Sequence, residues 1–181
     1  MAKSTDKKGR RAYLSDIQPN LAGEYVYVGS YYCYVPQGKT YLRALSEIIL
    51  LSLLSLAAFV AAGLVRAGGM GNCFYVLLPY IGEAISVFVL LWAVSKILIK
   101  GEKLREYVYG SSILRIPGAC VCSAAFAAVG LIGILVFTLL NGTDGSAGEY
   151  ILLLAAKLIA IAAPLLLKKL MKGLKWEIRE Q

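Results

Sequence analysis

Residues 74–99, FYVLLPYIGEAISVFVLLWAVSKILI, decide the fold of this chain. The stretch is apolar almost throughout, and it is interrupted near its middle by Gly82 and Glu83 and near its end by Lys96. A hydrocarbon core of about 30 Å requires roughly 20 apolar residues in a helix that crosses it. The stretch therefore predicts a transmembrane helix.

Three other segments have the same length and character, namely residues 44–65, 116–140 and 150–170. In a chain of 181 residues that is 59% hydrophobic, these four segments leave little sequence for a second domain. We predict an all-α integral membrane protein in which residues 44–170 form a four-transmembrane-helix bundle. An N-terminal segment, residues 1–43, precedes the bundle, and a tail, residues 171–181, follows it.

The net charge of +8 is explained by where the 19 Lys and Arg residues lie. Seven lie in residues 3–43, five in 96–115 and five in 168–179, whereas the loop 141–149 has two acids and no base. The positive-inside rule assigns the three basic segments to the cytoplasm. We therefore expect a multi-pass protein of a cell membrane, of the bacterial cytoplasmic type, with both termini inside. Its basic segments would contact anionic lipid headgroups in the bilayer, and we expect no nucleic-acid partner.

The N-terminal segment contains two runs rich in Tyr and Val, residues 24–28 and 31–35, separated by Gly29 and Ser30. Glycine at the first central position suits a type II′ turn, so the pattern predicts a β-hairpin over residues 24–35 that covers the cytoplasmic end of the bundle. An irregular Tyr-rich segment at the headgroup level is the alternative. The tyrosines that this hairpin would offer to a partner are Tyr25, Tyr27, Tyr31, Tyr32 and Tyr34. The first ten residues are expected to be disordered.

Small residues distinguish the third predicted helix. Ala119, Ser123 and Ala127 recur at four-residue spacing, and Gly130 and Gly133 follow them. Such residues let membrane helices approach closely, so we expect this helix at the centre of the bundle, against the first or the fourth helix. The short loop after the first helix makes the first two helices antiparallel neighbours.

The segments near the membrane boundary are expected to be simple. Glu47 follows Arg43 by four residues in the first turns of the first helix, and we interpret it as an interfacial anchor. Residues 100–115 form a connector along the headgroups. The ending of the chain, residues 165–181, is an interfacial anchor in which Lys168 and Lys169 extend toward water and Trp176 lies in the headgroup zone.

An internal likeness hints at a duplication. Residues 55–65 and 122–132 share six identities, and Gly82-Glu83 matches Gly148-Glu149 at nearly the same offset. Two copies of a helix pair in one orientation would explain both matches. Chance similarity between apolar segments is the alternative. A true duplication would also place Glu83 at the membrane boundary.

Four residues inside the predicted membrane segments are candidates for a polar site: Glu83, Lys157, Pro79 and Pro164. Glu83 lies nine residues after the start of the second helix and Lys157 seven residues after the start of the fourth, so at 1.5 Å per residue their depths differ by only about 3 Å. A lone charge at this depth is costly, and we therefore predict that the two form an ion pair. The alternatives are that Glu83 is interfacial or protonated.

Several kinds of chemistry have no support in the sequence. The chain contains no His, which excludes imidazole ligands and His-based acid–base catalysis. Cys120 and Cys122 are two apart and point to different faces of a helix, so they do not form a redox pair. We expect no catalytic residue, no metal site and no cofactor.

Two functions remain, with enzymes acting on lipids as a third and weaker one. The first is a non-enzymatic, partner-binding accessory subunit whose bundle anchors a small cytoplasmic module. The second is a small oligomeric transport or permeation protein in which Glu83, Lys157 and the backbone near Pro79 and Pro164 line a polar path. The discriminating feature is whether Glu83 faces water or only Lys157.

Overall fold

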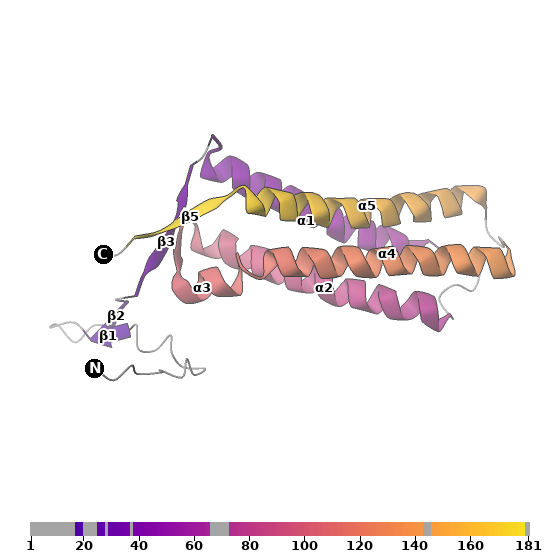
Figure 1. Cartoon of the computed structure of the whole chain (residues 1–181), viewed down its shortest axis with the longest axis horizontal. Coiled ribbons are helices and arrows are strands. Elements are labelled where there is room, and N and C mark those ends of the chain that lie inside the picture. Colours follow the sequence, from indigo (N-terminus) through magenta and orange to yellow (C-terminus); the bar gives the residue numbers. More distant parts are fainter. Residues whose placement is uncertain are drawn as a thin grey trace, which may run out of the picture.

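The computed structural model describes residues 17–19, 25–27, 29–36, 38–65, 73–142 and 146–179. The expected disorder of the first ten residues lies outside this range. Within it, four long helices run side by side along the length of the molecule (Figure 1). They are α1 (Tyr41–Leu64), α2 (Phe74–Lys100), α4 (Ile116–Asn141) and α5 (Ala147–Lys172). All four are long and apolar enough to cross a membrane.

The predicted bundle of a small polytopic membrane protein is therefore confirmed. The outer surfaces of the helices carry large exposed apolar side chains, such as Phe88, Trp92 and Leu139, which suits contact with lipid rather than water. Two predicted helices are too short at their N-termini. Helix α1 begins at Tyr41 and α5 at Ala147, where Ser146 caps α5 by accepting a hydrogen bond from the backbone N–H of Glu149.

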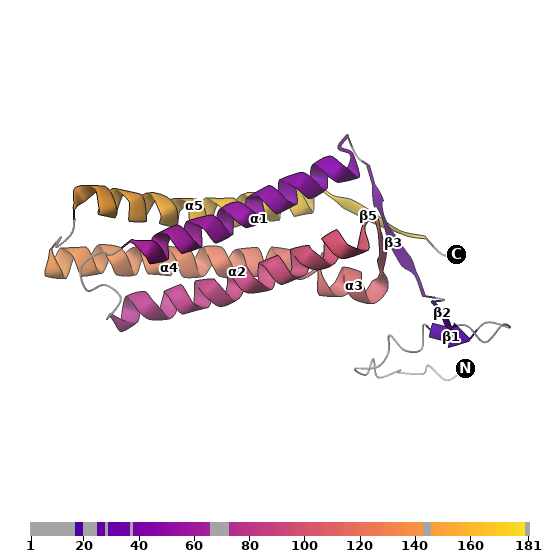
Figure 2. The same ribbon diagram turned by 180° about the vertical axis from the view of Figure 1, so that it is seen from behind.

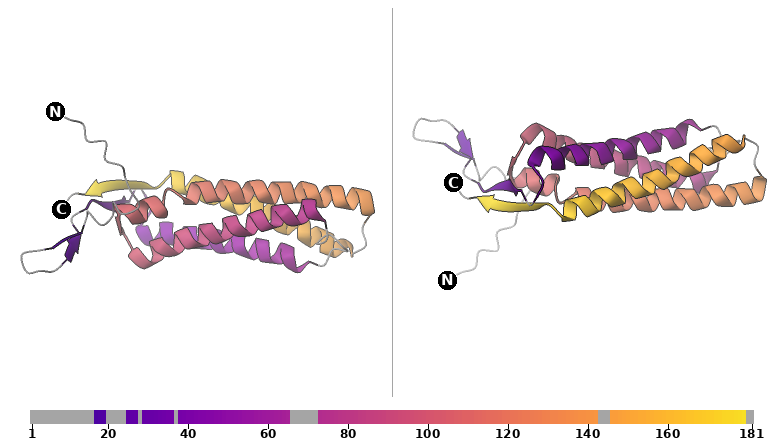
Figure 3. Two further views of the ribbon diagram at one scale, coloured as in Figure 1. Left: turned by 90° about the horizontal axis from the view of Figure 1, so that it is seen from below. Right: turned by 90° about the horizontal axis from the view of Figure 1, so that it is seen from above.

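The helices pack in the cyclic order α1, α5, α4, α2, with the most extensive contacts between α2 and α4, α1 and α5, and α4 and α5. Figure 3 shows this arrangement from below and above. We predicted that the third membrane helix, α4, packs against the first or the fourth. It packs against the fourth, α5, and also against the second, α2, which the sequence does not predict. Helices α1 and α2 also contact each other, but less extensively. Helices α2 and α5 lie diagonally opposite and run in the same direction.

A three-stranded antiparallel sheet lies at the end of the bundle where α1 and α4 begin (Figure 2). We call this the sheet end and the opposite end, with the connections α1–α2 and α4–α5, the loop end. The central strand is β3 (Tyr31–Val35), and its neighbours are β4 (Lys103–Arg105) and β5 (Lys175–Arg179). The sheet therefore joins the N-terminal segment, the connector between α2 and α4, and the tail.

The predicted hairpin over residues 24–35 is wrong. Strand β2 (Tyr25–Tyr27) pairs with β1 (Ile17–Pro19), and both edges of β3 are occupied by β4 and β5. The strand was recognised correctly, but its partners are distant in sequence. Pairing along the whole of β3 buries more of the Tyr-rich strand than a two-stranded hairpin would, and an isolated hairpin is marginally stable.

The connector and the tail are accordingly more structured than predicted. After β4, the connector forms the short helix α3 (Glu106–Ser111). The ring of Tyr109 on α3 stacks on Tyr32 at a centroid distance of 4.0 Å, and Trp176 of β5 contacts both Tyr109 and Tyr34 edge-on. These rings fasten the sheet to the end of the bundle.

The internal likeness does not correspond to equivalent positions. Glu83 lies in the third turn of α2, whereas Glu149 lies in the first turn of α5. Residues 55–65 end with α1, whereas 122–132 end well before α4 does. The matched segments therefore occupy different depths, which favours chance similarity over duplication.

Candidate functional site

The centre of the bundle contains an ion pair between α2 and α5. Lys157 Nζ donates to Glu83 Oε2 at 2.5 Å. Lys157 is 3% exposed and Glu83 is 0% exposed, so the pair is almost completely shielded from water and lipid. The predicted Glu83–Lys157 pair is confirmed, and neither the interfacial position nor solvent exposure of Glu83 is compatible with this burial.

The pair crosses the diagonal of the bundle, and α4 makes room for it. A Cβ atom at Gly130 would lie 3.5 Å from Lys157 Nζ and 3.7 Å from the Cβ of Pro79. The ring centroid of Tyr80 lies 5.2 Å from the same ammonium group, which adds a cation–π interaction. Lys157 is thus enclosed by α2 and α4, and its charge is balanced by a carboxylate and by the face of a ring.

Pro79 is buried on α2 and brings α2 close to α4. Because proline has no N–H, the carbonyl of Tyr75, four residues earlier, lacks its usual helical donor. A Cβ atom at Gly133 would lie only 2.9 Å from that carbonyl oxygen, so the two backbones touch where α4 has a glycine. Pro164 is also buried, and α5 continues through it. Pro164 frees the carbonyl of Ala160, four residues earlier, and no side chain donates to that carbonyl among the described residues.

No polar route leads away from the ion pair within the described residues. The hydroxyls of Ser52, Ser55 and Ser86 donate to carbonyl oxygens of their own helices, four residues earlier. Glu83 Oε1 is buried and has no hydrogen-bond partner in the described part of the chain. The pair is therefore a closed unit between two helices rather than a member of a hydrogen-bonded chain.

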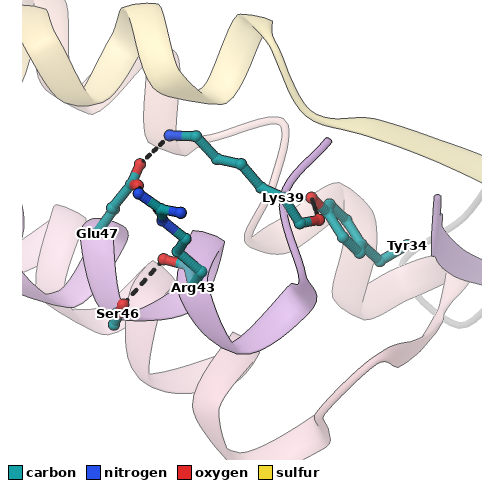
Figure 4. Close-up of polar contacts among 5 residues, drawn as sticks. All are labelled: Tyr34, Lys39, Arg43, Ser46 and Glu47. Atoms are coloured by element: carbon teal, nitrogen blue, oxygen red, sulfur yellow. Dashed lines mark hydrogen bonds and ion pairs between the residues drawn. The ribbon is translucent and has the colours of Figure 1, made fainter. Parts of the chain in front are cut away.

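A second polar cluster lies at the sheet end, beside a pocket of about 550 Å³ between α1 and α5. Lys39 Nζ lies 2.5 Å from Glu47 Oε2, and Arg43 Nε lies 3.7 Å from Glu47 Oε1. Figure 4 shows Lys39 and Arg43 both directed toward Glu47. The pocket is lined by Tyr34, Lys39, Glu47, Leu50, Leu51, Leu166, Lys169, Leu170, Gly173 and Leu174.

The sequence did not predict this pocket. The sequence pairs Glu47 with Arg43 alone and indicates only an interfacial anchor at Lys169, because no one-dimensional pattern connects the start of α1 with the end of α5. Glu47 lies closer to Lys39 than to Arg43. Lys39 is positioned by the turn before α1, where the hydroxyl of Tyr34 donates to the carbonyl of Lys39 at 3.1 Å.

The five tyrosines that we predict to bind a partner do not form one surface. In the register of the sheet, Tyr32 is opposite Leu104 and Tyr34 opposite Trp176, so these tyrosines share the face that packs on the helices. Tyr31 lies on the other face, since successive side chains alternate. Tyr25 is 77% exposed on β2, and the backbone of Tyr27 lies in the same strand.

No cluster of three or more His, Cys, Asp or Glu residues that could hold a metal ion occurs in the described part of the chain. Comparisons of the chain with protein-family models, with curated proteins and with solved structures found no match. The geometry of the chain is therefore the basis for the function that we propose.

Proposed function

We propose that the chain is a non-enzymatic membrane protein that acts by binding a partner at its sheet end, as an accessory subunit of a larger assembly. The observation that carries this proposal is the closed Glu83–Lys157 pair. A permeation path requires intramembrane charges that face a water-filled cavity. Here the carboxylate faces the ammonium group, and both are buried.

The sheet supports a binding role for the sheet end. Its outer face, opposite Tyr32 and Tyr34, carries exposed Lys103, Lys175, Glu177 and Arg179. This excess of positive charge matches a partner with an acidic surface. The sheet is held by three separate segments of the chain, so it presents a preorganised surface rather than a flexible tail.

The test is the mass and composition of the particle extracted from native membranes in mild detergent. We expect a second protein in fixed stoichiometry with the chain. The double variant Lys175→Glu/Arg179→Glu should release it, whereas Lys100→Glu, at the end of α2 and outside the sheet, should not. A homogeneous monomer with nothing attached would contradict the proposal.

Transport by an oligomer is the alternative, and only the presence of two charges inside the bundle favours it. Flux of a solute through vesicles that contain the purified chain alone would support it if Glu83→Gln abolished the flux. The accessory-subunit proposal expects no flux in either protein.

The orientation of the bundle is part of the same proposal, since an acidic cytoplasmic partner can meet the sheet only if the sheet end is inside. Cys73 precedes α2 at the loop end, and Cys33 lies on β3 at the sheet end. In intact cells, a membrane-impermeant thiol reagent should label Cys73 and spare Cys33. The reverse pattern would place the sheet end outside.

A further inference from the structure

We infer that the pocket between α1 and α5 is a binding site for a phospholipid with a net negative headgroup. This site is distinct from the outer face of the sheet and does not depend on whether a protein partner binds there. The polarity of the pocket, its position along the helices and its charges support this assignment.

The pocket changes from polar to apolar in the direction of the helix axes. Its polar lining comes from the turn before α1, with Lys39, from the second turn of α1, with Glu47, and from the last turn of α5, with Lys169. Leu50, Leu51 and Leu166 lie about one helical turn deeper in the bundle. A lipid has the same gradient, because its charged headgroup lies at the membrane boundary and its acyl chain extends into the hydrocarbon core. A volume of about 550 Å³ is sufficient for part of such a molecule.

The charges around the pocket favour an anion. Glu47 is held by Lys39 at 2.5 Å and by Arg43 at 3.7 Å, so the one acid in the lining is already neutralised. Lys169 faces the pocket from α5, and the structure gives it no acidic partner among the described residues. A phosphate in the pocket would accept a charge-assisted hydrogen bond from Lys169.

The same arrangement explains why the pocket lies between α1 and α5. These helices pack extensively against each other, and the chain leaves α5 at Gly173 to enter β5, so the pocket lies where the contact between the two helices ends. An acyl chain can occupy the space that opens there, against leucine side chains, without displacing the ion pair at the centre of the bundle.

The test is retention of lipid by the full-length chain. The protein is reconstituted in vesicles of equal parts phosphatidylglycerol and phosphatidylcholine, extracted in mild detergent, and its bound lipids are counted by native mass spectrometry. We expect one phosphatidylglycerol per chain in preference to phosphatidylcholine. Lys169→Gln should lower that preference about tenfold, which corresponds to one charge-assisted hydrogen bond.

Matched variants separate this site from general attraction of a basic protein to anionic lipid. Lys100→Gln removes an exposed base at the same end of the bundle but outside the pocket, and it should leave the preference unchanged. Glu47→Gln frees Lys39 and Arg43, so its preference should be at least that of the unmodified chain. Equal losses in Lys169→Gln and Lys100→Gln, or a loss in Glu47→Gln, would overturn the assignment.

Two further arms test the acyl chain and the source of the phosphate. Leu50→Trp fills the deep part of the pocket and should abolish retention, whereas Leu53→Trp, which is exposed outside the pocket, should not. An excess of inorganic phosphate should fail to displace the lipid. Displacement by phosphate, or equal retention in the two tryptophan variants, would show that the pocket does not hold a lipid.

Discussion

Two Lys–Glu ion pairs in the described part of the chain have the same separation of 2.5 Å and very different surroundings. The side chains of Lys157 and Glu83 are 4% and 0% exposed at the centre of the bundle, whereas those of Lys39 and Glu47 are 41% and 31% exposed at the sheet end. Identical chemistry therefore has two different consequences. The buried pair specifies which helices face each other, and the partly exposed pair can rearrange around a ligand.

The difference follows from the cost of leaving one partner alone. When a buried pair loses one member, the remaining charge has no solvent to compensate it. When an exposed pair loses one member, water and counter-ions replace the missing partner. Substitutions at the two pairs should therefore differ strongly in their effect on stability.

The first prediction concerns the buried pair. Glu83→Ala, which leaves Lys157 unpaired in the bundle, should lower the free energy of unfolding by about 3 to 5 kcal/mol. The measurement is unfolding of the purified chain in mixed micelles with increasing denaturing detergent, followed by loss of helicity. The matched control is Glu47→Ala in the same host. Equal losses in the two variants would show that burial does not distinguish the pairs.

The second prediction concerns the glycine contact beside the buried pair. Gly133→Ala places a methyl group against the carbonyl of Tyr75 and should cost about 1 to 3 kcal/mol, because a backbone atom cannot move aside as a flexible side chain can. The control is Gly118→Ala on the same helix, where a Cβ atom meets nothing within 4 Å.

The control should be neutral or stabilising by up to about 1 kcal/mol, since alanine favours a helix more than glycine does. If both variants are neutral in the micelle unfolding assay, α2 and α4 do not approach as closely as the structure shows.

The third prediction concerns the partly exposed pair. Glu47→Gln should change the free energy of unfolding by less than about 1 kcal/mol, because both partners remain in contact with solvent. The change should shrink further when salt is added, since exposed charges are screened. A large loss that is insensitive to salt would mean that this pair also holds α1 in position.

Much of the bundle could be predicted from the sequence because a membrane-spanning helix is recognised from the residues of its own segment. Each of the four segments is long and apolar by itself, and the depths of Glu83 and Lys157 follow from counting residues along two helices that run in the same direction. The ion pair could be predicted because each of these two charges is costly when it is unpaired and both lie at the same depth. The cyclic order of the helices could not be predicted from the loops. A short loop joins α1 and α2, yet these two helices contact each other less extensively than the other neighbouring helices do.

The sheet and the pocket could not be predicted in the same way, because their parts are far apart in the sequence. Tyr31–Val35 was recognised as a strand, but the hairpin rule selects the nearest partner, and the actual partners follow α2 and α5. One signal was present: Leu174, Trp176 and Ile178 alternate with Lys175, Glu177 and Arg179, a period of two that is typical of a strand. The pocket had no such signal.

The most direct test of the account is an exchange of the two buried charges. Glu83→Lys and Lys157→Glu should each reduce the folded yield and the stability of the chain in mixed micelles, because each places two like charges together at the centre of the bundle. The double variant restores one acid and one base in the same space, and we expect it to recover much of what either single variant loses. If the double variant is as unstable as the worse single variant, the two side chains do not form the pair that holds α2 to α5.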